Sequence, residues 1–274
     1  MNQSHLRHTI SALVMLMAMT ACVLPGQAAQ TQAIQPTPGL DTNSVATAVL
    51  GTAQAAATQT ASANLFAPSM TGTTIEQLED GTTKYTDREG GFEIIFPVGW
   101  LALRPNSEEF DAALAKQGAV NPMLRDQMTT DLAGYDANFD RLYSYVLRPD
   151  LKKNVILGFS KLVWASEDTL SLDTVTMGEL VRGLEAPGGI PGFRADTAQL
   201  HEDSNVKMIE IGGRFTLSDG QGGTLPFYTT IIVFKPSSTS SARITFTFIE
   251  DYHTQIAADV KSIIESIRII EPQP

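Results

Sequence analysis

The sequence predicts one α+β domain, in which an antiparallel β-sheet has helices packed against it. Long runs of short strands separated by turn residues favour antiparallel pairing. A clearly amphipathic helix ends the chain. With 274 residues, of which 43% are hydrophobic, the chain is long enough to form one substantial core. We find no internal repeat and no second linker, so residues 75–271 are expected to form a single domain.

The strands are predicted from alternating apolar residues between clusters of Gly, Pro, Asn and Asp. Folded structure is expected to begin near Thr82. The expected strands span residues 82–86, 92–96, 141–147, 154–164, 194–201, 209–217, 225–235 and 243–249.

The helices are predicted from capping residues and apolar stripes. Asn106 begins a capping box for a helix that ends near residue 117, and Asn121 begins a second helix. Ser171 is expected to cap a third helix, which runs to about Leu184. The last helix is the clearest, because its apolar residues share one face: Tyr252, Ile256, Val260, Ile263, Ile264 and Ile267.

The N-terminus reads as an export signal. An apolar run at residues 10–19 is too short to span a bilayer comfortably, and it stops at Met19-Thr20-Ala21-Cys22. Small residues before a cysteine resemble the lipobox of bacterial lipoproteins. That resemblance implies a signal peptide at residues 1–21, cleavage before Cys22 and diacylglyceryl transfer to its thiol. The alternatives are an ordinary signal cut near Ala28 and an uncleaved anchor, and all three place the domain outside the cytoplasm.

Residues 22–74 are predicted to form a stalk between the anchor and the domain. They are rich in Ala, Thr and Gln and almost free of charge, so they cannot bury enough apolar surface to fold. About 50 flexible residues span roughly 40 Å. The stalk would therefore lift the domain clear of the membrane.

Charge and cysteine content exclude several classes of function. The formal net charge is -11, and residues before 75 contribute nothing to it, because Arg7 and Asp41 cancel. An acidic domain is repelled by phosphate backbones, so nucleic acid is not an expected partner. Cys22 is the single cysteine of the chain, which leaves no internal disulfide and no multi-thiolate metal site.

The segment Phe92–Trp100 has the pattern F-x-x-x-F-P-x-G-W. It resembles the start of PsbP-like domains, which include the DcrB-type bacterial lipoproteins, and the order of the later elements agrees. The resemblance implies an α/β/α sandwich and work as an accessory or adaptor protein, with no common active site. The metal and photosystem contacts of the plant members are not carried over, because no motif for them is recognisable here.

No catalytic, metal or cofactor signature stands out. His201-Glu202-Asp203 resembles a metal cluster, but adjacent side chains on an extended chain point to opposite faces. His253 reads as a solvated residue at a helix start. Ser160 lies mid-strand and lacks the nucleophile elbow of hydrolases. We expect no cofactor, no bound metal and no enzymatic activity.

The Gly- and Pro-rich loop 186–193 is the predicted partner contact, through Ile190, Pro191 and Phe193. The leading hypothesis is a non-catalytic binding or accessory module, held to a membrane by its lipid and contacting another envelope protein. One alternative is an extracytoplasmic hydrolase, which requires a deep pocket with convergent carboxylates around His201. The other is a structural spacer at the cell surface, which requires self-association.

Overall fold

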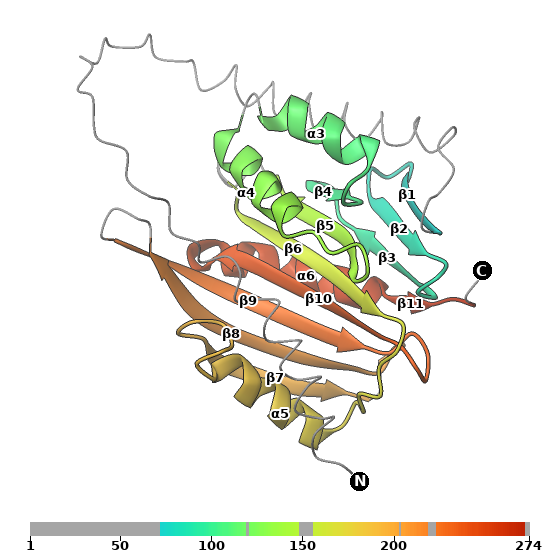
Figure 1. Ribbon diagram of the computed structural model, residues 1–274, viewed down its shortest axis with the longest axis vertical. Helices are drawn as coiled ribbons and strands as arrows, with labels where there is room; N and C mark the ends of the chain where they lie inside the picture. The colour runs from blue at the N-terminus through green and yellow to red at the C-terminus, as the bar shows by residue number, and fades with distance from the viewer. Residues whose placement is uncertain (1–71, 119–120, 148–155, 203, 219–222, 272–274) are drawn as a thin grey trace.

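The computed structural model describes residues 72–118, 121–147, 156–202, 204–218 and 223–271 (Figure 1). They form the expected α+β fold, but with two antiparallel sheets in place of one. The large sheet has the order β4 (Trp100–Leu103), β5 (Asp140–Val146), β6 (Gly158–Ala165), β10 (Ser241–Ile249), β9 (Thr224–Phe234), β8 (Met208–Ser218) and β7 (Arg194–His201). The small sheet has the order β1 (Thr73–Gln77), β2 (Thr83–Asp87), β3 (Phe92–Phe96) and β11 (Arg268–Ile269).

The two faces of the large sheet bury different side chains, because successive residues of a strand point to opposite sides. On one face, Ile232 and Ile244 join a core shared with the small sheet and with α6 (His253–Ser266). On the opposite face, two separate clusters form. One lies under α3 (Glu108–Gly118) and α4 (Pro122–Ala133), and the other lies under α5 (Thr174–Glu185).

Short edge strands account for most of the missed elements. β1 begins at Thr73, within the segment predicted as stalk and before the expected start at Thr82, and it pairs with β2. β4 begins at Trp100, where the sequence indicated only the end of a strand. β11 has two residues and pairs with β3. The rest of the predicted stalk, the signal peptide and Cys22 lie outside the described residues.

Two predicted caps were one or two residues from the observed ones. Asn106 has a positive φ of 54°, and the hydroxyl of Ser107 accepts the N–H of Phe110 instead. At α5 the capping side chain is Asp173, which accepts the N–H of Thr176, and not Ser171. Asn121 caps α4 as predicted.

α6 covers only part of its face of the large sheet. Its buried residues Ile256, Val260 and Ile263 pack into the core that joins the two sheets. Figure 1 shows α6 behind β10 and β9, while β8 and β7 extend beyond it. The opposite side of these last strands is covered by α5, which packs on Ile209 and Ile211. The strand face beside α6 therefore has room for a groove.

Candidate functional site

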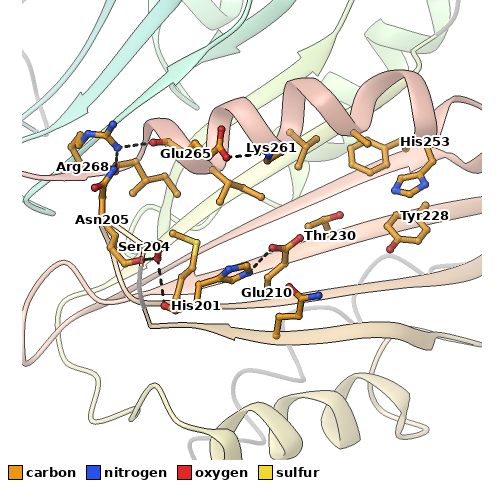
Figure 2. Close-up of a pocket in the computed structure, with 18 residues that line it drawn as sticks. His201, Ser204, Asn205, Glu210, Tyr228, Thr230, His253, Lys261, Glu265 and Arg268 are labelled. Atoms are coloured by element: carbon orange, nitrogen blue, oxygen red, sulfur yellow. Dashed lines mark hydrogen bonds and ion pairs between the residues drawn. The ribbon is translucent and has the colours of Figure 1, made fainter.

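A groove of about 770 Å³ lies between α6 and the strands β7, β8, β9 and β10. Figure 2 shows His253 and Tyr228 at one end of it and Arg268 and Asn205 at the other. Its size falls in the range of small-molecule and cofactor sites. The sequence analysis did not predict this groove as a site.

The floor of the groove is apolar and largely buried. Its side chains come from three strands, from the loop before β8, from α6 and from the residue that follows α6: Val206, Met208, Tyr228, Phe248, Val260 and Ile267. Each of these is less than 10% exposed. A ligand that covers this floor would bury apolar surface, at about 25 cal/mol per Å².

The rim of the groove is polar along both sides. On the strand side, Gln199 and His201 come from β7, and Glu210 comes from β8. On the helix side, Lys261 and Glu265 form an exposed ion pair of 3.4 Å between Nζ and Oε1. Polar rims of this kind fix the orientation of a ligand whose apolar part is buried below.

His201 and Glu210 form a pair inside the groove. The ring Nε2 lies 2.8 Å from Oε2 of Glu210, and both side chains are about one-third exposed. They are diagonal neighbours, because His201 is opposite Met208 and Glu210 is opposite Gln199 in the β7–β8 ladder. His201 therefore lies in a concave site with one carboxylate at its ring. Its sequence neighbour Glu202 points elsewhere and pairs with Lys207.

His253 closes the other end of the groove. It begins α6, as predicted, but its ring is half-buried and stacks on Tyr228 with centroids 3.7 Å apart, so it is not a fully solvated side chain. Partial burial, assisted by the nearby Arg214 guanidinium, lowers the pKa of His253 below its usual value. The ring is accordingly neutral at physiological pH and acts as an aromatic surface.

Gly212 makes room for Tyr228. A Cβ at this position would lie 2.4 Å from the Tyr228 hydroxyl and 2.7 Å from Oγ1 of Thr197. The two side chains therefore meet across the backbone of β8, where a larger residue would displace the ring that supports His253. The glycine is thus part of the construction of the groove.

The predicted contact loop 186–193 is well packed against α5. The N–H of Ile190 donates to the carbonyl of Leu184, and Ile190 packs on the cluster under α5. Phe193 is 1% exposed and lies against Gly213, so its ring supports the loop from inside and cannot serve as a surface contact. Pro191 is exposed. As a partner surface, this loop remains a prediction that rests on Pro191 and part of Ile190.

Ser160 and the two tryptophans make structural contacts. The hydroxyl of Ser160 lies 2.7 Å from that of Ser144 on the neighbouring strand. Trp100 packs against Phe246, and Trp164 lies under the Arg141 guanidinium. Across the described residues, no three His, Cys, Asp or Glu side chains gather closely enough to hold a metal ion.

The alternation in β8 could have indicated the groove. Ile209 and Ile211 are apolar and face α5, whereas Met208, Glu210 and Gly212 alternate with them on the other side. A carboxylate and a glycine among otherwise apolar strands mark a face that is not fully covered. The sequence alone did not show which strands α6 would cover and which it would leave open.

No family model and no curated protein match the chain. Among solved structures, it is similar to PsbP from Synechocystis sp. PCC 6803, with 9% identity and a TM-score of 0.43 over 69% of this chain and 92% of that one. It is also similar to LpqN of Mycobacterium tuberculosis, described as involved in cell envelope biogenesis, with 12% identity and a TM-score of 0.39 over 72% and 90%.

A third similar structure is the immunity protein TplEi of the type VI secretion system from Pseudomonas aeruginosa, with 10% identity and a TM-score of 0.33 over 71% of this chain and 75% of that one. The matches thus include a PsbP, the family that the Phe92–Trp100 motif resembles. At these TM-scores they add nothing to the argument about function. In the described part of the chain, no helix is long and apolar enough to cross a membrane.

Proposed function

We propose that this protein is a lipid-anchored binding module that faces away from the cytoplasm and takes its ligand in the groove beside α6. The groove is the observation that carries the proposal. It offers about 770 Å³, a buried apolar floor and a polar rim, which are the properties of sites that hold a ligand by burial and orient it by hydrogen bonds. The lipobox-like sequence before Cys22 supports the membrane anchor.

The chemistry of the groove favours binding over catalysis. The His201 ring is paired with Glu210, whereas the Ser204 hydroxyl bonds to the main-chain oxygens of His201 and Val206. A nucleophile activated by a base needs the two groups within hydrogen-bond reach. Among the described residues of the groove, no hydroxyl makes such a bond to the His201 ring.

The proposal is tested with tagged full-length protein in the native host. Ala257 lines the groove, and Ala258 beside it on α6 is exposed. We expect Ala257→Trp to fill the groove and abolish capture of a membrane partner, while Ala258→Trp, a matched control, captures it normally. Cys22→Ala is expected to move the protein out of the membrane fraction and to remove the acyl mass from its N-terminal peptide.

Two results would contradict the proposal. If the wild-type protein carries no lipid and stays out of the membrane fraction, the chain is not anchored through Cys22. Equal capture by both tryptophan variants would show that the groove does not bind the partner. The surface around Pro191 would then be the next candidate for the contact.

A hydrolase is the second candidate, because the groove places a histidine beside a carboxylate. In this case His201 would activate a water molecule as a general base, oriented by Glu210. Turnover of a simple ester such as p-nitrophenyl acetate, lost in His201→Gln and kept in His253→Gln, would favour catalysis. Equal background rates in all three proteins would exclude His201 as a base for that ester.

A further inference from the structure

The groove has the length of an extended peptide. Its helix-side residues recur at successive turns of α6, from His253 through Ala257 and Lys261 to Arg268 just beyond the helix. At 1.5 Å per residue, this stretch is about 22 Å long. An extended chain advances about 3.3 Å per residue, so about seven residues would fill it. Figure 2 shows α6 running along the groove with the strands beneath it.

The polar groups are spread along the groove and are not gathered at one end. Gln199, Glu210 and Thr230 lie along the strand side, and Ser204 and Asn205 lie toward the Arg268 end. An acyl chain would remove these groups from water without offering any hydrogen bond, at a cost of about 1–3 kcal/mol for each group left unpaired. A peptide brings an N–H and a C=O at every residue, and its alternate side chains can reach the apolar floor.

The groove is accessible from its side. β7 is the edge strand of the large sheet, and most of its residues are exposed. Gln199 and His201 of this strand form the outer rim. A segment inside a longer polypeptide can therefore lie across the rim without threading a free end.

The charges favour a neutral or basic ligand. Within the groove, the positive charges of Lys261 and Arg268 are balanced by the negative charges of Glu210 and Glu265. The lining itself therefore has no strong preference for a ligand of either charge. The whole acidic excess of -11, however, belongs to residues after 75. Its field repels acidic chains and attracts basic ones during the approach.

We propose that the groove binds an extended segment of a partner polypeptide, about seven residues long and neutral or basic, with apolar side chains directed at the floor between Met208 and Ile264. This inference rests on the proposed function and names the ligand class of the same groove. The ligand remains uncleaved, and the His201–Glu210 pair offers its polar atoms to the peptide backbone.

The test uses full-length protein in lipid nanodiscs and a phage-displayed library of random heptapeptides, with empty nanodiscs for subtraction. We expect selection on wild-type protein to enrich a motif with apolar residues at alternate positions and few acidic residues. A synthetic peptide of that motif should bind Ala257→Trp at least tenfold more weakly than wild type. It should bind Ala258→Trp as wild type does.

The outcomes separate the ligand class from the function of the groove. No enriched motif, or a peptide that binds both tryptophan variants equally, would overturn the peptide assignment. Displacement of the peptide by decanoate at concentrations that leave the nanodiscs intact would assign the groove to acyl chains instead. If groove-dependent capture in the host persists in either case, the proposed function stands and only the ligand class falls.

Discussion

Asp131 is on α4 and contacts Tyr145 of β5, where burial makes its charge unfavourable. Oδ2 accepts the hydroxyl of Tyr145 at 2.9 Å, and Oδ1 accepts the amide of Gln127 at 2.9 Å. Burial outweighs these hydrogen bonds and raises the pKa of Asp131 from 3.8 to about 6. The folded state therefore holds a proton on this carboxyl group over a pH range in which the unfolded chain has lost it.

The raised pKa predicts a stability that falls with rising pH. Between pH 4 and 6 Asp131 binds more protons in the folded protein than in the unfolded chain, so its contribution to the free energy of unfolding decreases through this window and levels off above it. We expect Asp131→Asn to remove this contribution to the slope and to gain on the order of 2 kcal/mol relative to wild type at pH 7. The measurement is urea unfolding of both proteins at pH 4, 5, 6 and 7.

The control for this prediction is Asp126→Asn, which removes a carboxylate from an exposed position of the same helix. The difference in unfolding free energy between wild type and Asp131→Asn should grow between pH 4 and 6. A difference that is the same at all four pH values would show that the Asp131 carboxyl does not titrate in this window in the folded state.

At the scale of elements, the end of α6 is joined to β3 by one hydroxyl group. The N–H of Ile95 donates to Oγ of Ser266 at 2.9 Å. The same oxygen lies 3.2 Å from the Ile95 carbonyl and 2.7 Å from the Ile263 carbonyl. β11 pairs with β3 only at Glu93 and Phe92, so Ser266 bonds to the part of β3 beyond the reach of that strand.

Replacing this hydroxyl should weaken the fold measurably. Ser266→Ala leaves the partly buried N–H of Ile95 without its acceptor, and we expect a loss of about 1–2 kcal/mol in unfolding free energy. Ser262, exposed on the same helix, is the matched position, and Ser262→Ala should stay within about 0.5 kcal/mol of wild type. Chemical denaturation of the three proteins measures both values. Equal losses in the two variants would mean that the bond to β3 contributes nothing.

The elements that were predictable from sequence are those with a long local pattern. The apolar face of α6 and the alternation of β8 and β9 repeat over several turns or residue pairs, so their type and position followed directly. β4 and β11 have four residues and two residues, which is too short for a period to develop. β11 exists because α6 returns the chain to β3, and no local pattern encodes that return.

The groove was not predictable for a related reason. His201 and Glu210 are nine positions apart, and only the β7–β8 register brings their side chains together. His253 was interpreted from its place at a helix start, but the position of Tyr228 on β9 decides its surroundings. Phe193 was interpreted from its loop, whereas the bare backbone of Gly213 provides its buried site. Each of these outcomes depends on contacts between distant segments.

At the scale of the whole molecule, a buried charge network connects the two sheets. Arg141 at the start of β5 lies 2.9 Å from Glu89 and 3.6 Å from the carboxylate of Asp87, the last residue of the small-sheet strand β2. Asp87 is fully buried and also accepts the N–H of Gly90. Burial raises the pKa of Asp87, and the hydrogen bond from the Gly90 N–H and the Arg141 guanidinium oppose that shift. The large sheet thus supplies a cation to this turn of the small sheet.

A double-mutant cycle tests whether this network links the sheets energetically. Arg141→Met leaves the Asp87 carboxylate buried without its cation, and breaking such a pair costs about 3–5 kcal/mol. We expect Asp87→Asn in the Arg141→Met background to recover at least about 1 kcal/mol, because the remaining group is then neutral. Urea unfolding of the four proteins gives the coupling.

Two signals follow the unfolding of the sheets. Circular dichroism reports on all strands, and tryptophan fluorescence reports on Trp164, which lies under Arg141, together with Trp100 in the shared core. Because one core contains residues of both sheets and of α6, the two signals should coincide in wild type. Additive losses in the cycle would show that Asp87 and Arg141 act independently, and separate transitions in wild type would show that the sheets unfold as two units.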